Sequence, residues 1–248
     1  HTQALTTMPN SKVYIDGSAG TTGLRIQERL ANRRDLDVTV LDYEDRRDVE
    51  LRRAATATAD LTILCLPDDA AIEAAAWAKE SGTKVVDAST AHRVNDDWAF
   101  GLPEMAPTQR EKIQNAQNVS NPGCYPTGMI LSLRPIIEQG LLGKDAPITI
   151  HALSGYSGGG KNLITKWEGG QKNLEKLPFE SPYALHTAHK HVPEMTKYAG
   201  LTHEPQFIPA VGPFINGMRL EIPIHKAVLP ESTTANDIWE VLDQRYAN

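Results

Sequence analysis

Short apolar runs alternate with amphipathic segments through the first half of the chain. The apolar runs predict strands at residues 12–16, 36–41, 61–66, 84–87 and 118–120. Between them, helical spacing of apolar positions predicts helices at residues 24–34, 45–57 and 69–81. Alternating elements of these lengths predict an α/β fold whose N-terminal part is a Rossmann-like, doubly wound parallel sheet.

The pattern changes after Thr127. Residues 147–154 alternate as a half-buried strand, 207–223 predict two strands around Gly212, and 234–246 predict a helix. These elements indicate a second, α+β domain that carries substrate and catalysis. We therefore divide the chain into a tag remnant and disordered start at 1–11, a cofactor domain at 12–122 and a catalytic domain at 123–248.

A glycine-rich turn follows the first predicted strand. Gly17, Gly20 and Gly23 have the spacing G-x-x-G-x-x-G, and a predicted helix comes next. Glycines at such a turn let the backbone approach a dinucleotide pyrophosphate, which then meets the helix N-terminus. The expected cofactor loop comprises Gly17, Ser18, Ala19, Gly20, Thr21, Thr22 and Gly23.

Two further loops leave the carboxyl ends of parallel strands, where ligands of such sheets bind. They are residues 67–69 and 88–93, and we expect Pro67 and Ser89 to contact the cofactor. After the second strand, Asp42 and Glu44 suit the ribose hydroxyls of NAD, whereas Arg46 and Arg47 suit the NADP phosphate. The residues alone leave both dinucleotides open.

Cys124 is the strongest candidate nucleophile. It follows a strand and a Pro-Gly turn, and it precedes Pro126 and an apolar helix body at 129–137. A helix N-terminus carries backbone N–H groups and partial positive charge, which favour the reactive thiolate. Proline is tolerated in the first helical turn. Cys65, by contrast, lies within a predicted buried strand and is read as a core residue.

Residues 155–161 form a second glycine-rich run that ends in Lys161. The run fits G-x-x-x-x-G-K, but Asn162 stands where a phosphate-binding P-loop has Ser or Thr for Mg²⁺. A kinase or ATPase is therefore disfavoured. We expect this loop to bind an anionic substrate through Ser157, Gly158 and Lys161.

Three histidines, His186, His189 and His191, precede Glu194. Imidazole titrates near neutral pH, so the cluster can supply the acid and base for Cys124. H-x-x-H-x-H is not a recognised ligand spacing and no cysteine pair lies nearby, so we expect no metal site.

Composition narrows the class of protein. The net charge of −6 disfavours nucleic acid as a partner, and no apolar run reaches the length of a membrane span. Two cysteines in 248 residues argue for a reducing compartment, which we take to be the cytoplasm.

Five segments together resemble the N-acetyl-γ-glutamyl-phosphate reductases of arginine biosynthesis, in their short (type 2) form. They begin at Ile15, Cys65, Ser120, Ser154 and His189, and the run Asn-Pro-Gly-Cys-Tyr-Pro-Thr at 121–127 is the most specific. The resemblance covers about residues 12–246.

This resemblance implies an NADPH-dependent reduction of a small acyl phosphate to an aldehyde, with release of phosphate. It implies that Cys124 forms a thioester, that His191 or His189 is the acid and base, and that residues 17–23 hold NADP. Arg93, Asn121 and Lys161 are then expected to bind substrate.

The family's chains normally continue past the position of Asn248, so the resemblance implies that a C-terminal segment is absent. We also expect a homo-oligomer, a dimer or a tetramer. Two alternatives stay open: a noncatalytic NADP-binding sensor, and an aspartate-semialdehyde dehydrogenase-like reductase.

Overall fold

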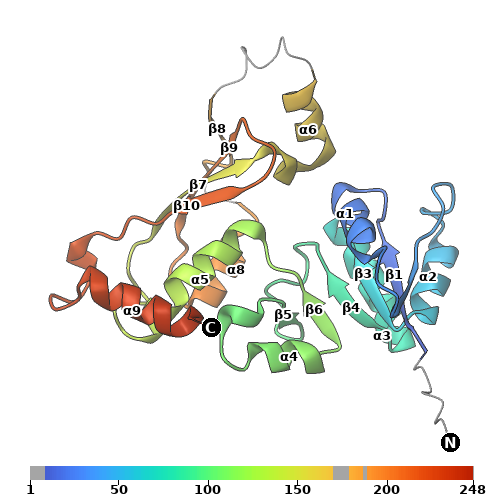
Figure 1. The fold of residues 1–248 in the computed structure, drawn as a ribbon, viewed down its shortest axis with the longest axis horizontal. Helices are drawn as coiled ribbons and strands as arrows, with labels where there is room; N and C mark the ends of the chain where they lie inside the picture. The colour runs from blue at the N-terminus through green and yellow to red at the C-terminus, as the bar shows by residue number, and fades with distance from the viewer. Residues whose placement is uncertain (1–8, 170–178, 187–188, 248) are drawn as a thin grey trace, which may run out of the picture. The chain divides into compact units, whose positions relative to one another are not determined.

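A computed structural model describes residues 9–169, 179–186 and 189–247 of the chain (Figure 1). It divides into two compact units. Unit 1 comprises His1–Phe100 and Asn115–Asn121, and unit 2 comprises Gly101–Gln114 and Pro122–Asn248. Residues 1–8, most of the predicted N-terminal start, lie outside the described part.

Unit 1 is built on a parallel sheet in the order β2-β1-β3-β4-β6-β5, which confirms the predicted fold class. Its strands are β1 (Ser11–Asp16), β2 (Leu36–Thr39), β3 (Leu61–Leu64), β4 (Lys84–Asp87), β5 (Ala99–Phe100) and β6 (Asn118–Ser120). Because all strands are parallel, their carboxyl ends share one edge, the edge at which such sheets bind ligands.

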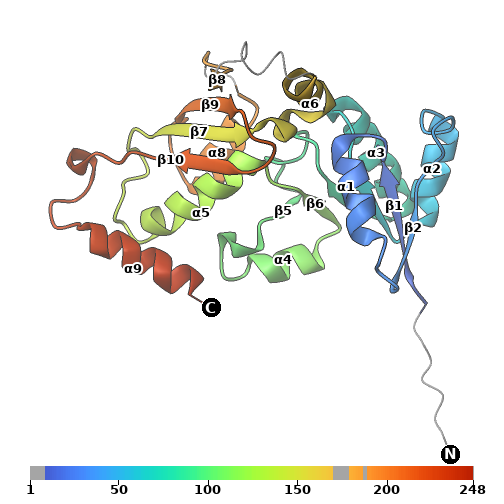
Figure 2. The same ribbon diagram turned by 45° about the horizontal axis from the view of Figure 1, so that its top comes forward.

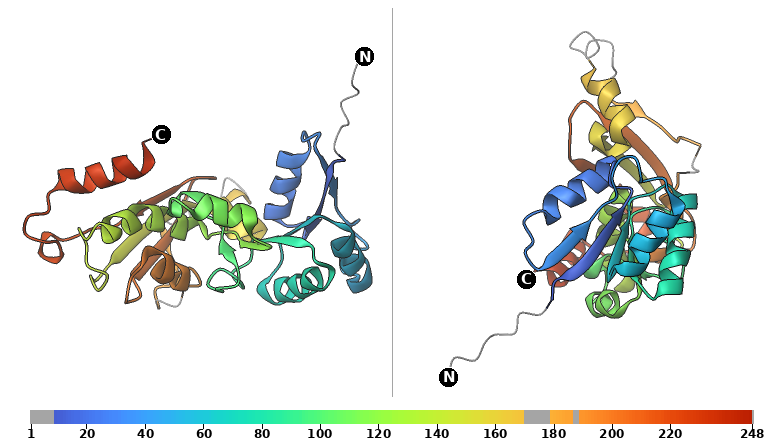
Figure 3. Two further views of the ribbon diagram at one scale, coloured as in Figure 1. Left: turned by 90° about the horizontal axis from the view of Figure 1, so that it is seen from below. Right: turned by 90° about the vertical axis from the view of Figure 1, so that its right-hand side faces the viewer.

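Helices cover both faces of this sheet. They are α1 (Thr21–Leu30), α2 (Val49–Thr58) and α3 (Asp68–Ser81). Helix α1 lies on one face, whereas α2 and α3 pack side by side on the other (Figure 3). Small side chains on α3, among them Ala71, Ala74 and Ala78, allow that helix to pack closely on Leu64 and Val85.

Unit 2 is built on a mixed sheet in the order β10-β7-β9-β8, as the prediction of a second α+β domain required (Figure 2). Its strands are β7 (Thr149–Gly155), β8 (Ser181–Pro182), β9 (Gln206–Gly212) and β10 (Met218–Glu221). Strands β7 and β9 are parallel, and the two edge strands are antiparallel to them.

The helices of unit 2 are α4 (Gln109–Asn115), α5 (Cys124–Glu138), α6 (Gly160–Glu168), α8 (Val192–Ala199) and α9 (Ala235–Tyr246). Helices α5 and α8 pack together, and both contribute to one core with the sheet. Met129, Leu133 and Met195 are almost completely buried there. Because α5 is anchored by this core, its first residue, Cys124, has a fixed place at the end of a rigid element.

Several predicted boundaries were wrong. Helix α2 begins at Val49, not at residue 45, because the Asp48 side chain caps it by accepting a hydrogen bond from Leu51 N–H. Helix α1 begins at Thr21, earlier than predicted, and ends at Leu30. No helix in the described residues is both long and apolar enough to cross a membrane.

Candidate active site

The glycine turn after β1 shows why two of its three glycines are needed. Gly17 has φ +85°, and a Cβ there would lie 2.3 Å from the Cys65 carbonyl oxygen. A Cβ at Gly23 would lie 2.5 Å from the Gly17 carbonyl oxygen. These glycines provide the tight turn and the close packing of α1 on the strands.

Gly20 is different. Its φ is −79°, and the nearest atom to a Cβ built there is the Gly17 carbonyl oxygen at 3.5 Å. The fold therefore tolerates a side chain at position 20, which lies at the N-cap of α1 and is exposed. A glycine at this position leaves open the approach that a pyrophosphate needs to a helix N-terminus, so the loop fits a dinucleotide.

The three predicted ligand loops of unit 1 meet at one edge of the sheet. Gly17 packs against the backbone of Cys65 and the side chain of Leu66, directly before Pro67. Asp68 then accepts hydrogen bonds from the Thr90 backbone N–H at 2.8 Å and hydroxyl at 2.5 Å. The parallel topology thus brings residues 17–23, 67–69 and 88–93 together as predicted.

A buried ion pair lies at the base of the glycine turn. Arg52 of α2 donates two hydrogen bonds to Asp16 Oδ2, at 3.1 and 3.0 Å, and both side chains are less than a tenth exposed. The Trp77 ring lies 5.0 Å from the Arg52 guanidinium. Burial, followed by the Asp16 charge, raises the pKa of the neighbouring Tyr14. This pair fixes α2 to the last residue before the turn.

Residues 42–47 form a turn between β2 and α2. The Asp42 carbonyl accepts hydrogen bonds from the backbone N–H groups of Asp45 and Arg46. The Arg46 guanidinium stacks on Tyr43, with its Cζ atom 3.3 Å from the ring centroid, and it donates to the Tyr43 carbonyl at 3.1 Å. Arg46 is therefore held in place before any ligand binds, and Arg47 is exposed beside it.

Cys124 is exposed and is the first residue of α5. Gly123 is the N-cap, and the Thr127 N–H closes the first helical turn by donating to the Gly123 carbonyl at 3.0 Å. Cys65 lies in a different environment, because burial, then the charges of Asp16 and Asp87, raise the pKa of its thiol to about 11. Only Cys124 therefore combines exposure with a helix N-terminus.

Glu194 holds the start of α5, a role that sequence analysis missed. Its side chain is 1% exposed, and Oε2 accepts the Gly123 N–H at 3.0 Å. A carboxylate acceptor makes this a strong hydrogen bond. Pro193 in the first turn of α8 and Gly200 after its last turn were the sequence signals for this helix.

His189 and His191 lie beside Cys124's neighbour, Tyr125. The two imidazole rings are 4.6 Å apart, and the Tyr125 ring lies 6.4 Å from His189 and 5.9 Å from His191. His189 Nδ1 accepts the His191 backbone N–H at 3.1 Å, so neutral His189 carries its proton on Nε2. Burial, then Lys190, lowers the pKa of His189. His186 is exposed.

Two tyrosines complete this cluster. Burial, then a hydrogen bond to Tyr125, raises the pKa of Tyr183. Burial raises the pKa of Tyr125, and the nearby Cys124 contributes to both shifts. Both phenols therefore stay protonated and can donate hydrogen bonds near the thiol, although neither was among the predicted site residues.

The loop at 155–161 uses several of its donors within the protein. Tyr156 N–H and Ser157 N–H donate to the carbonyls of Phe214 and Ile215, and Ser157 Oγ donates to Asn216. Gly158 faces open space, and Lys161 is exposed in the first turn of α6. This bonding gives no support to a phosphate-cradling P-loop.

The predicted residues divide between the two units. Unit 1 holds residues 17–23, Arg46, Arg47, Pro67, Ser89, Arg93 and Asn121, and unit 2 holds Cys124, Ser157, Gly158, Lys161, His189 and His191. The Ser89 hydroxyl donates to Asp87 at 2.6 Å and accepts from Ala91 N–H at 3.2 Å, so it is already engaged inside its loop. Asn121 is exposed, and its backbone N–H donates to the Asp87 carbonyl.

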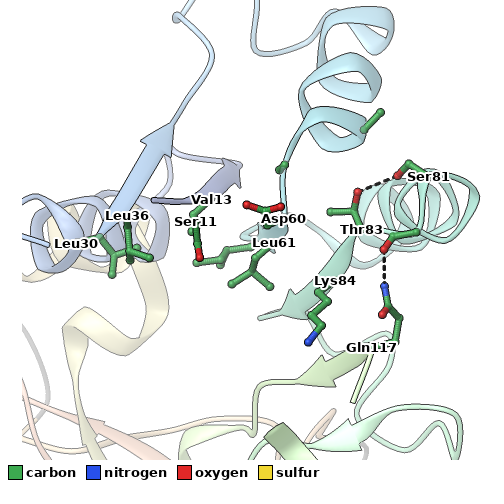
Figure 4. Close-up of a pocket in the computed structure, with 14 residues that line it drawn as sticks. Ser11, Val13, Leu30, Leu36, Asp60, Leu61, Ser81, Thr83, Lys84 and Gln117 are labelled. Atoms are coloured by element: carbon green, nitrogen blue, oxygen red, sulfur yellow. Dashed lines mark hydrogen bonds between the residues drawn. The ribbon is translucent and has the colours of Figure 1, made fainter. Parts of the chain in front are cut away.

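A cavity in unit 1 lies away from these residues. This cavity of about 760 Å³ is lined by Ser11, Leu36, Leu61 and Lys84, the first residues of their strands (Figure 4). It therefore lies at the amino edge of the sheet, opposite the ligand loops. Among the described residues, no group of three His, Cys, Asp or Glu side chains could hold a metal ion.

Two family models match the chain. The semialdehyde dehydrogenase NAD-binding domain matches residues 12–116, and the semialdehyde dehydrogenase dimerisation domain matches residues 124–248. The fold is also that of solved aspartate-semialdehyde dehydrogenases. The Vibrio cholerae enzyme II superposes with a TM-score of 0.72 at 19% identity, covering 95% of this chain and 79% of that one. The Francisella tularensis enzyme gives 0.67 at 14% identity, covering 95% and 80%.

Curated relatives are much closer in sequence. N-acetyl-γ-glutamyl-phosphate reductase 2 of a Nostoc species is 46% identical over 96% of this chain and 75% of its own length. The reductase of Burkholderia lata is 46% identical over 97% of this chain and 76% of its own length. The relatives are longer than this chain, so its assignment to the short form stays a prediction. Identity at this level over nearly the whole chain, together with both domain models, shows that the chain belongs to the N-acetyl-γ-glutamyl-phosphate reductase family.

Proposed function

We propose that this chain reduces N-acetyl-γ-glutamyl phosphate to N-acetylglutamate semialdehyde with NADPH, releasing phosphate, as a step of arginine biosynthesis in the cytoplasm. The observation that carries the proposal is the exposed thiol at the N-terminus of α5, followed by Tyr125, whose ring lies against His189 and His191, in a chain of this family. The cytoplasm agrees with the low cysteine count. A dimerisation domain supports a homo-oligomer, a dimer or a tetramer.

The cofactor loop of unit 1 fits NADPH. Residues 17–23 provide the pyrophosphate approach, Arg46 and Arg47 face the 2′-phosphate, and Pro67 and Ser89 line the neighbouring loops. The stacking of Arg46 on Tyr43 supports NADP over NAD, because it fixes a guanidinium where the phosphate is expected. NADPH, when bound, supplies the hydride that reduces the acyl group.

Cys124 attacks first. His191 takes the thiol proton, and the thiolate forms a C–S bond with the γ-acyl carbon. The bond from that carbon to the phosphate oxygen breaks, and phosphate leaves with the electron pair, leaving a thioester. Backbone N–H groups of the first turn of α5 stabilise the transient oxyanion. His191, with its ring beside His189, holds the proton and returns it when the C–S bond breaks and the aldehyde departs.

Cationic side chains bind the substrate against the overall charge of −6. Arg93 and Lys161 attract the acyl phosphate and stabilise the departing phosphate, while Asn121, Ser157 and Gly158 contact the rest of the substrate. His189 is the alternative acid and base. Its lowered pKa favours the neutral form at pH 7, which suits a donor through Nε2.

The reverse reaction tests this function. N-acetylglutamate semialdehyde, phosphate and NADP⁺ should give NADPH, and a phosphate-free control should give none. Cys124→Ser should abolish turnover while retaining NADP⁺ binding, because only the nucleophile is removed. Cys65→Ser is the matched control and should stay active, because that thiol is buried with a raised pKa.

The opposite results separate the alternatives. Activity of Cys124→Ser equal to wild type would exclude the covalent step. Binding of NADP⁺ without phosphate-dependent turnover in the wild-type chain would favour a noncatalytic sensor, and turnover of aspartate semialdehyde in preference to the N-acetylated substrate would reassign the substrate.

A further inference from the structure

Asp87, the last residue of β4, and His92, in the loop that follows, belong to a buried polar network, and neither of the two has a role in the mechanism above. The Asp87 side chain is fully buried at the carboxyl end of the strand. It accepts hydrogen bonds from Ser89 N–H at 2.8 Å and from the Ser89 hydroxyl at 2.6 Å. A third contact joins its Oδ2 to His92 Nδ1 at 2.7 Å. A buried carboxylate needs such partners, so Asp87 dictates where the loop runs.

His92 is fixed from two directions. Because a carboxylate can only accept, His92 carries a proton on Nδ1 and donates it to Asp87. Its ring also stacks on Trp98, with centroids 3.9 Å apart and planes 11° from parallel. Both residues are buried. A stack and a charge-assisted hydrogen bond together leave the imidazole one orientation.

Arg93 is the next residue, and its side chain is 7% exposed. Its guanidinium donates to the Ala88 carbonyl at 3.2 Å, so the side chain folds back across the loop that Asp87 organises. The His92 carbonyl also accepts Asn95 N–H at 3.2 Å. The backbone on both sides of Arg93 is therefore determined by the contacts of Asp87 and His92.

We propose that Asp87 and His92, with Trp98 stacked beneath, are positioning residues that hold Arg93 in the orientation that binds phosphate. The inference rests on the proposed function, in which Arg93 binds the acyl phosphate and the departing phosphate. A planar guanidinium binds phosphate strongly when it donates two parallel hydrogen bonds, and a displaced guanidinium cannot donate both. The network would thus act on phosphate affinity through Arg93 and leave the glycine turn at residues 17–23 unchanged.

The test measures the KM for phosphate in the reverse reaction, with NADP⁺ and aldehyde saturating. His92→Phe keeps an aromatic ring to stack on Trp98 but cannot donate to Asp87. We expect it to raise the phosphate KM about tenfold while the NADP⁺ KM stays within twofold. His92→Asn, whose amide can donate from about the position of Nδ1, should restore most of the phosphate affinity.

A double-mutant cycle then asks whether His92 acts through Arg93. Arg93→Ala alone should raise the phosphate KM, and adding His92→Phe to it should cause no further rise. Thr83→Val is the matched control, because it removes a buried hydrogen bond from Thr83 Oγ to the Thr56 carbonyl at the other end of β4. It should leave the phosphate KM unchanged.

Additive effects of His92→Phe and Arg93→Ala would overturn the proposal, as would an equal rise of both KM values in His92→Phe. If His92→Phe does not fold, Trp98→Leu, which removes the ring that stacks on His92, replaces it in the double-mutant cycle with Arg93→Ala. Wild-type NADPH formation that depends on phosphate is measured in the same assay. Its absence would refute the proposed function, whereas its presence with an additive cycle would refute only this inference.

Discussion

At the scale of single residues, steric constraints separate Gly17 and Gly23, which the fold needs, from Gly20, which we propose serves the cofactor. Gly17 combines a positive φ with a backbone neighbour that a Cβ would strike, whereas Gly20 has neither constraint. The three glycines look equivalent in the sequence, because spacing alone does not reveal which backbone atoms lie opposite each of them. The surroundings of Gly17 differ from those of Gly20 only in the folded chain, because the pairing of β1 with β3 brings the Cys65 carbonyl against Gly17.

Gly17→Ala and Gly20→Ala should therefore fail in different ways. Gly17→Ala should lower stability by about 1–3 kcal/mol or more, because it adds backbone strain and a clash with Cys65. Gly20→Ala should unfold within a few degrees of wild type but raise the KM for NADP⁺. Thermal unfolding and cofactor KM values measured on both variants check this. Equal loss of stability in the two variants would contradict it.

His189 predicts a pH dependence of stability. Burial lowers its pKa in the folded chain, so the unfolded chain binds the proton more readily. The contribution of His189 to stability is therefore complete above the unfolded pKa of about 6.5 and declines as pH falls below it.

His189→Gln should remove that part of the pH dependence. The unfolding temperature of wild type should fall more steeply between about pH 7 and pH 5.5 than that of the variant, measured in matched buffers. His151→Gln, on the exposed side of β7, is the control and should keep the wild-type slope. Parallel curves for wild type and His189→Gln would contradict the prediction.

At the scale of elements, helix α2 was predicted from the sequence, but its first residue and the turn that precedes it were not. Residues 45–57 have helical spacing, yet the helix starts only at Val49, because Asp48 caps it. Residues 42–47 are consequently a turn, which allows Arg46 to fold back on Tyr43. A contact between residues three apart in a turn depends on local backbone geometry that periodicity does not encode.

This turn should decide between NADP and NAD. Arg46→Ala should raise the KM for NADP⁺ about tenfold and change the KM for NAD⁺ by less than twofold, since one charge-assisted phosphate contact is lost. Arg53→Ala is the matched control, because that exposed arginine of α2 pairs with Glu80 instead. Similar changes for both dinucleotides in Arg46→Ala would show that the turn does not read the 2′-phosphate.

Other elements escaped prediction for physical reasons that differ from case to case. Strand β5 has two residues, too few for any alternation to be visible. Helix α4 is short and mostly polar, so its periodicity is weak. Helix α8, by contrast, carries Pro193, Met195, Ala199 and a terminal Gly200, and these signals were available. The role of Glu194 was not predictable in the same way, because its hydrogen bond to Gly123 N–H joins residues 71 apart in the chain.

At the scale of the whole molecule, the chain crosses between its two units more than once. It leaves unit 1 after Phe100, returns for β6 and leaves again at Pro122. Asn121, Pro122 and Gly123 therefore connect the last strand of the cofactor sheet directly to the nucleophile. The motif at residues 121–127 indicated this connection. That residues 101–114 belong to unit 2 depends on contacts between distant parts of the chain, which the sequence pattern does not reveal.

This division predicts that cofactor binding and covalent chemistry can be separated by mutation. NADP⁺ at 100 times its Kd should stabilise the folded chain by about 2.7 kcal/mol through mass action, seen as a rise in unfolding temperature. Cys124→Ser should show the same rise as wild type, because residues 17–23 lie in unit 1 and the thiol lies in unit 2. Gly20→Ala, measured at the same NADP⁺ concentration, should show a smaller rise although its thiol is intact. If NADP⁺ did not raise the unfolding temperature of Cys124→Ser, the thiol would contribute to cofactor binding. Cofactor binding and covalent chemistry could then not be separated by mutation.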